Sequence, residues 1–135
     1  KNAVFISRGD GSGTHEKEKD IWKREGIAQK GSWYIEAGQG MGEVINMAEE
    51  RQAYTLADRG TYIAYKKKSD LVLLYEGDKT LFNPYGVITV NPQRHPHVKH
   101  DLAKKLTEFL TSEEGQGIIA EFKINGEQLF FPNAK

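Results

Sequence analysis

Cysteine is absent from the 135 residues of this chain. Its absence excludes disulfides, thiolate metal sites and thiol catalysis together. Long apolar runs are missing too, since no stretch approaches the roughly 18 to 20 residues that span a membrane. There is also no excess of positive or negative charge, because nineteen basic residues balance nineteen acidic ones. Without a net field to attract nucleic acid, we expect no nucleic-acid partner, and any anion site must be built locally.

The beginning of the chain lacks an initiator methionine and a signal peptide, and residues 2–6 already have the composition of a strand. A chain that opens inside a core strand is either processed close to its domain or is a piece of something larger. We favour the second interpretation, since nothing here resembles a flexible mature N-terminus. The length itself is that of one ordinary domain.

Short apolar runs alternate along the chain with stretches of helical periodicity. The runs that predict strands are residues 3–6, 33–35, 53–56, 71–75 and 85–90. Helices are expected over 14–25, 41–48, 58–65 and 98–110, and from a cap at Ser112 to an end at Asn125-Gly126. This alternation predicts an α/β domain with a mostly parallel sheet flanked by helices, followed by a C-terminal helical pair.

A glycine-rich loop, residues 7–14, gathers several kinds of hydrogen-bond donor between the first strand and the first helix. Ser12 and Thr14 supply hydroxyls, and the first N–H groups of the helix lack partners and carry the positive end of its dipole. Arg8 adds a guanidinium fork that matches paired oxygens of a tetrahedral oxyanion. The backbone can turn sharply because glycine stands at positions 9, 11 and 13. We interpret the loop as an anion grip, against the simpler possibility that Ser12 or Thr14 merely caps a helix.

Two catalytic or nucleotide-binding interpretations of this loop fail on specific residues, and a third stays an alternative for which we expect no turnover. A P-loop needs lysine after its last glycine, whereas Gly13 is followed by Thr14. The sequence around Ser12 is one residue short of a nucleophile elbow, and no convincing His-Asp set follows. A phosphate hydrolase using Asp10 or His15 would need a general base near the loop, and His15 is the only candidate. We therefore expect a binding protein and no enzyme.

A second glycine turn, residues 38–42, also stands between a predicted strand and a predicted helix. A dinucleotide fingerprint would need glycine where Glu43 stands. The turn is either a plain connection or a second helix N-terminus directed at the same anion. Three histidines near Pro96 read as a polar loop more readily than as a zinc site, since only Asp101 could complete the ligand set. We expect neither a metal nor a cofactor.

Taken in order, these motifs carry a family resemblance. The segments S-R-G-D-G-S-G-T-H (7–15), W-Y-I-E-A-G-Q-G-M-G (33–42) and Y-T-L-A-D-R-G-T-Y (54–62) follow one another between strands and helices. They resemble the tungstate-binding proteins of bacterial ABC transporters, which are bilobal periplasmic binding proteins of type 2. Residues 85–92 and 110–116 are similar to the hinge-crossing strand and the end helices of molybdate- and tungstate-type binders.

The resemblance implies a set of ligand residues and a division of the chain. Arg8 and Thr14 would be anion ligands, Ser12 and Gly13 would donate nearby, and Gly40 and Met41 would offer backbone donors. Asp10 would orient Arg8 or the loop. Residues 1–84 would form the second ligand-binding lobe, and residues 85–135 the hinge-crossing strand and the C-terminal helices. The first lobe, with its own anion loop, is missing from this sequence.

The function that the resemblance implies is the substrate-binding component of an ABC transporter. It would capture tungstate or molybdate and deliver it to a membrane permease, in the periplasm or outside the cell, with a lipid anchor on the parent protein as one option. The alternative is the ligand-sensing domain of an oxyanion-responsive transcription regulator. Apolar residues that would have faced the absent lobe also allow self-association.

Overall fold

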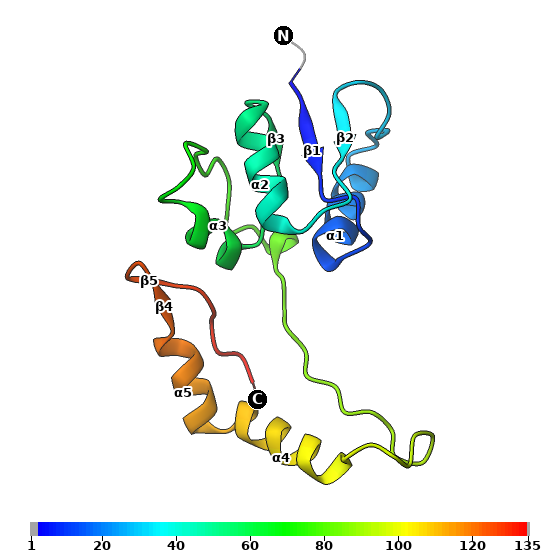
Figure 1. The fold of residues 1–135 in the computed structure, drawn as a ribbon, viewed down its shortest axis with the longest axis vertical. Coiled ribbons are helices and arrows are strands. Elements are labelled where there is room, and N and C mark those ends of the chain that lie inside the picture. Colours follow the sequence, from blue (N-terminus) through cyan, green and yellow to red (C-terminus); the bar gives the residue numbers. More distant parts are fainter. Residues whose placement is uncertain (1–2, 135) are drawn as a thin grey trace. The chain divides into compact units, whose positions relative to one another are not determined.

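The computed structural model describes residues 3–134 of the chain. The chain divides into two compact units and passes from one to the other between Phe82 and Asn83, as Figure 1 shows. The assignment of residues 1–84 and 85–135 to parts of a bilobal protein stays a prediction. Among the described residues, no helix combines the length and the apolar character needed to cross a membrane.

The first unit is a three-stranded parallel sheet with a helix after every strand. Its elements in chain order are β1 (Phe5–Ser7), α1 (Gly13–Arg24), β2 (Tyr34–Glu36), α2 (Met41–Glu50), β3 (Tyr54–Thr55), α3 (Arg59–Tyr65) and the short 3₁₀ helix η1 (Lys79–Leu81). The strand order is β2-β1-β3, with Ile6 of β1 opposite Ile35 and Thr55. Because all three strands are parallel, their carboxyl ends and the N-termini of the following helices lie at one edge of the sheet.

The two faces of the sheet are covered by different helices. Ile6 is fully buried in a core with the apolar stripe of α2, whose members are Met41, Val44, Ile45 and Ala48. The preceding Phe5 packs edge-to-face on Trp22 of α1, with ring centroids 5.1 Å apart. Since successive strand side chains point to opposite faces, α2 and α1 cover opposite sides of β1. The α2 stripe has the helical spacing that the sequence predicts, and burying each large side chain contributes about 1.5–3 kcal/mol.

The second unit contains a pair of helices and a small hairpin. Its elements are α4 (His100–Thr111), α5 (Glu113–Glu121), β4 (Lys123–Ile124) and β5 (Glu127–Gln128). Ser112 lies between the helices, and its hydroxyl accepts a hydrogen bond from Gly115 N at 3.1 Å, which caps α5. The predicted α/β class with a mostly parallel sheet and a C-terminal helical pair is confirmed.

Three predicted features are wrong. Residues 71–75 and 85–90 form no strand; Val72 is 72% exposed and Ile88 is 90% exposed. A strand needs a neighbour for its N–H and C=O groups, and the described chain supplies none to these two segments. The last helix also ends at Glu121, before Asn125-Gly126. Both of those residues have positive φ and form the two-residue turn of the β4–β5 hairpin, which is the geometry that Asn-Gly favours.

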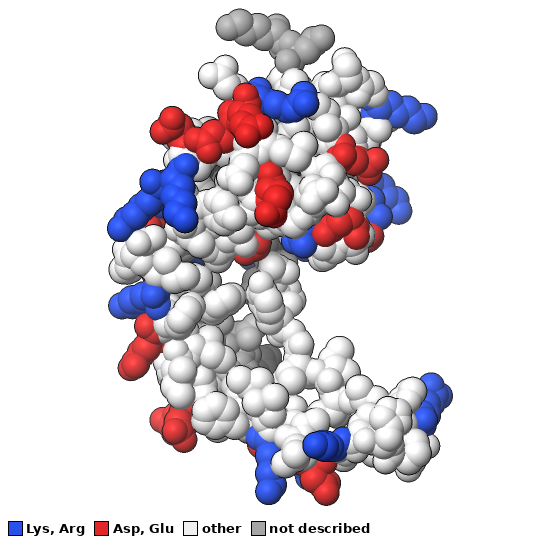
Figure 2. Space-filling model, in the orientation of Figure 1, with Lys and Arg blue, Asp and Glu red and all other residues white. Residues whose placement is uncertain are grey.

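Charged side chains of both signs are interspersed on the surface of the first unit. Figure 2 shows lysine and arginine next to aspartate and glutamate over the face drawn, with no broad area of one sign. This distribution agrees with the balance of nineteen basic and nineteen acidic residues. No long-range field of one sign is therefore expected to draw an anion to this face.

Candidate anion-binding site

The two glycine turns lie side by side at the carboxyl edge of the sheet. Ala37 N donates to Ser7 O at 2.9 Å, and Gly38 N donates to Arg8 O at 3.0 Å. These bonds continue the β1–β2 pairing past the strands and join the two turns. The structure therefore joins the start of the first turn, at Arg8, to the start of the second, at Gly38.

Gly9 is the residue that allows this close approach. Its φ is +63°, and a Cβ there would lie 2.8 Å from the Cβ of Glu36. An L side chain would meet both the strain of a left-handed backbone and a clash with β2. Glycine at position 9 is thus required by the path of the loop.

Arg8 and Asp10 form an ion pair that fixes the loop. Arg8 Nε donates to Asp10 Oδ2 at 2.8 Å, and Ser12 N donates to Asp10 Oδ1 at 3.0 Å. Hydrogen bonding from Ser12, with help from Arg8, lowers the pKa of Asp10 to about 2. Among residues 3–134, no group accepts from the Nη atoms of Arg8. The geometry agrees with the expectation that Asp10 orients Arg8, and it leaves the end of the guanidinium fork for a ligand.

At the N-terminus of α1, some backbone N–H groups bond to the protein and others have no partner among its described residues. Ser12 is the N-cap, and its Oγ accepts from His15 N at 3.4 Å, while Gly11 N donates to His15 Nδ1 at 2.9 Å. Within the described chain, the N–H groups of Gly13 and Thr14 have no partner. They point outward from a helix whose dipole favours negative charge, so they are the backbone donors that α1 can offer. Ser12 is occupied as a cap and as a partner of Asp10, and its role as a ligand stays a prediction.

The N-terminus of α2 also has backbone N–H donors, but an acidic side chain already lies beside them. Gly40 is its N-cap, with no side-chain capping bond, and the Met41 side chain is buried in the core. The carboxylate of Glu43 folds back toward the helix start, 3.2 Å from where a Cβ on Gly40 would lie. An acidic side chain there already interacts with the dipole. An anion would share this helix end with Glu43, so Gly40 and Met41 are weaker candidates than the α1 donors.

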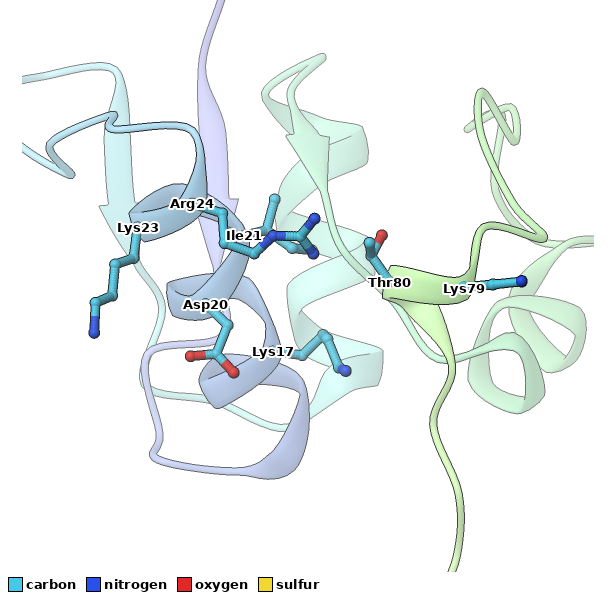
Figure 3. Close-up of a pocket in the computed structure, with 7 residues that line it drawn as sticks. All are labelled: Lys17, Asp20, Ile21, Lys23, Arg24, Lys79 and Thr80. Atoms are coloured by element: carbon cyan, nitrogen blue, oxygen red, sulfur yellow. The ribbon is translucent and has the colours of Figure 1, made fainter.

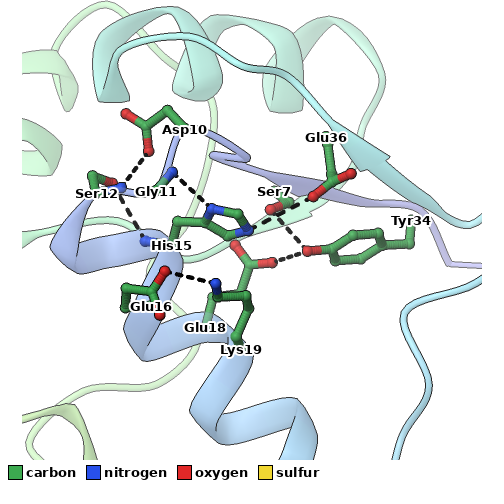
Figure 4. Close-up of polar contacts among 10 residues, drawn as sticks. All are labelled: Ser7, Asp10, Gly11, Ser12, His15, Glu16, Glu18, Lys19, Tyr34 and Glu36. Carbon is green, nitrogen blue, oxygen red and sulfur yellow. Dashed lines mark hydrogen bonds and ion pairs between the residues drawn. The ribbon is translucent and has the colours of Figure 1, made fainter.

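Beneath the loop lies a buried polar cluster that the sequence did not reveal, drawn in Figure 4. Tyr34 donates its hydroxyl to Glu18 Oε1 at 2.6 Å and lies 2.9 Å from Ser7 Oγ. Ser7 is fully buried and Glu18 is 2% exposed. Burial, and then the hydrogen bond to Glu18, raise the pKa of Tyr34 to about 12, so the hydroxyl remains a donor. Positions 15, 18 and 22 have helical spacing, which was the available signal that His15 and Glu18 face inward beside Trp22.

A comparison of the sequence with models of protein families identifies the family of this chain. The model of the PBP superfamily domain matches residues 1–114. This chain belongs to the PBP superfamily. The predicted kinship with periplasmic binding proteins is therefore confirmed.

Several relatives carry names that state a ligand. A tungstate-binding protein TupA of Peptoclostridium acidaminophilum is 48% identical over 132 residues, which cover 96% of this chain and 46% of the relative. The crystal structure of the tungstate ABC transporter from Geobacter sulfurreducens is 61% identical, with a TM-score of 0.80 over 89% of this chain and 51% of that one. The tungstate-binding protein TupA of Desulfovibrio alaskensis is 48% identical, with a TM-score of 0.81 over 99% and 56%. The chain thus spans about half the length of the relatives it matches.

A second cationic feature of the first unit lies on another side of α1. A pocket of about 510 Å³ is lined by Lys17, Asp20, Ile21, Lys23 and Arg24 of α1 and by Lys79 and Thr80 of η1. Figure 3 shows Arg24 and Lys17 directed toward Thr80, with Lys23 pointing away. Asp20 offsets part of the charge. The pocket combines cationic side chains with the carboxylate of Asp20, and it does not include the residues of the α1 loop.

The histidines near Pro96 are the remaining candidates from the sequence. His95 and His97 lie with ring centroids 6.1 Å apart. Among the residues that the structure describes, no group of three or more histidine, aspartate or glutamate side chains is placed to hold a metal ion. The chemistry available at the loop is therefore that of hydrogen-bond donors and one guanidinium, which suits the capture of an oxyanion.

Proposed function

We propose that this chain is half of the substrate-binding component of an ABC transporter, and that its loop binds a tetrahedral oxyanion, tungstate or molybdate. One observation carries the proposal: Arg8, oriented by Asp10, lies in the same eight-residue loop as the unpartnered N–H groups of Gly13 and Thr14. The relatives named for tungstate support the choice of ligand. A regulator's sensing domain is less supported, because one relative is named a putative ABC transporter anion-binding protein and one similar structure is that of a tungstate ABC transporter.

Each donor has a defined task in this proposal. The Nη groups of Arg8 bind two oxygens and offset part of the charge of a dianion. Gly13 N, Thr14 N and the Thr14 hydroxyl bind further oxygens, with Ser12, Gly40 and Met41 at the margin of the site. The site binds its ligand unchanged, because His15, the base nearest to the loop, has its Nδ1 occupied by Gly11 N.

The remainder of the protein supplies the other half of the binding site. In this proposal residues 1–84 form the second lobe, and residues 85–135 return to the first. Strands of the missing half would pair with the exposed segments 71–75 and 85–90. The whole protein acts in the periplasm or outside the cell, free or lipid-anchored, and passes the anion to a permease. The isolated chain binds the oxyanion more weakly than the whole protein does, since one lobe alone cannot exclude water from the ligand.

The test is calorimetric titration of the full-length protein with tungstate, molybdate, sulfate and phosphate. We expect Arg8→Ala to weaken tungstate binding more than about tenfold, which corresponds to the loss of a charge-assisted hydrogen bond. Arg24→Ala is the matched control, because it removes the same charge from the pocket at the far end of α1. Unchanged affinity in Arg8→Ala overturns the site, and a selective loss in Arg24→Ala moves it to that pocket.

A further inference from the structure

His15 occupies an unusual position for a titratable side chain next to an anion loop. It is the third residue of α1, and it is 8% exposed. Its Nδ1 accepts the hydrogen bond from Gly11 N at 2.9 Å, so the ring carries its proton on Nε2. Nε2 faces Glu36 of β2, with 3.7 Å between Nε2 and Oε1. Figure 4 shows the ring held between the loop on one side and β2 on the other.

This placement keeps the His15 ring from contacting a ligand directly. Both ring nitrogens are directed at protein groups, and the ring is buried, so His15 does not touch a ligand outside the loop. What the ring does hold is the backbone of Gly11, a residue with a φ of +73° in the middle of the turn. The neighbour of Gly11 on one side is Asp10, which orients Arg8, and on the other side is Ser12, which caps α1.

We propose that His15 is a positioning residue for the anion loop, acting through the backbone of Gly11. The bond to Nδ1 turns one loop amide inward and fixes the turn between Arg8 and α1. The guanidinium and the outward N–H groups of Gly13 and Thr14 are thereby held in one arrangement before the ligand arrives. A loop ordered in advance loses less conformational freedom on binding, and the affinity rises accordingly. The inference rests on the proposed anion site and adds to it the residue that shapes the loop.

Two substitutions at this position separate positioning from mere packing. In His15→Asn the amide oxygen lies as many bonds from Cα as Nδ1 does, so it can still accept from Gly11 N. In His15→Gln the amide lies one bond farther out, near the place of Nε2, and Gly11 loses its acceptor. We expect His15→Gln to weaken tungstate binding of the full-length protein about tenfold, as when one loop residue must be ordered anew. We expect His15→Asn to stay within about threefold of the wild type. The exposed His97→Gln is the control.

Hydrogen exchange of the wild-type protein provides a measurement that does not depend on the folding of any variant. Without ligand, the Gly11 amide should exchange slowly while the Gly13 and Thr14 amides exchange fast, and tungstate should slow the latter two. Equal exchange of Gly11 and Gly13 without ligand overturns the positioning role, as does wild-type affinity in His15→Gln. Equal losses of affinity in both variants, in step with their melting temperatures, assign His15 to packing alone. A wild-type protein that binds no oxyanion overturns the proposed function instead.

Discussion

At the scale of single residues, the most informative side chain of the loop is a negative one. Asp10 stands beside a proposed anion site, where its charge would repel the ligand if it were free. Instead its two oxygens accept from Arg8 Nε and Ser12 N. The carboxylate therefore acts as an internal strut that directs the guanidinium, while the Nη donors keep their capacity to bind. Its usefulness depends on its being ionised.

The pKa of Asp10 can be tested directly. The folded value is about 2 against an ordinary value of 3.8, so the ionised strut should persist as the pH falls to about 2. The associated stabilisation is present above the ordinary pKa and is lost as the pH falls through the folded one. Carbon-13 NMR titration of the Asp10 carboxyl should give a midpoint near 2. Ser12→Ala should raise the midpoint, because hydrogen bonding from Ser12 is the main cause of the shift. An ordinary midpoint in both proteins would show that the strut does not form.

At the scale of helices and strands, the orientation of α1 depends on a buried contact with β2. The hydroxyl of Tyr34 reaches from the first position of β2 to Glu18, in the middle of α1. Glu18 lies one turn below His15, on the inward side of the same helix. The contact therefore fixes the helix whose N-terminus forms the anion loop, and it does so with polar groups where an apolar side chain would be usual.

Tyr34→Phe removes this contact at constant shape. We expect the free energy of unfolding to fall by about 1–3 kcal/mol, because the buried carboxylate of Glu18 loses its donor. The matched control is Tyr54→Phe, since Tyr54 is 52% exposed and its hydroxyl has no hydrogen bond within the described chain. That change should stay within about 0.5 kcal/mol. Urea denaturation of both variants measures the difference, and equal effects would mean that the Tyr34 hydroxyl contributes nothing to stability.

Elements that depend on nearby residues were predictable from the sequence. The caps of α1, α3 and α5 at Ser12, Asp58 and Ser112 lie where the residue types indicate, because a cap bonds to its own helix three residues on. The contact between Tyr34 and Glu18 was not predictable, since it joins residues 16 positions apart through the tertiary fold. The apolar segments 71–75 and 85–90 failed as strands for a related reason. Their pattern indicates burial, but pairing depends on a partner that the described chain does not contain.

At the scale of the whole molecule, the exposed apolar residues and the length of the relatives point the same way. Val72, Leu74 and Ile88 are exposed large hydrophobic side chains, each in a segment with strand composition. The chain covers 46% of one tungstate-binding relative and 56% of another. Several large apolar side chains left exposed in one segment mark a surface that another chain or segment can cover. Such exposure agrees with the proposal that this chain is half of a larger binding protein.

The isolated chain should therefore self-associate, whereas the full-length protein should not. A second copy can cover the apolar segments that, in the proposed function, the other half of the full-length protein covers, and the gain grows with the apolar area buried. In sedimentation velocity experiments, the mean mass of the isolated chain should rise with concentration. Ile88→Asp should reduce that rise, because a charge then stands in an interface that must exclude water. Gln93→Asp, which adds the same charge at an exposed polar position outside the segment, is the control. An isolated chain that stays monomeric at every concentration, or one whose association ignores Ile88→Asp, would remove segment 85–90 from the self-association surface.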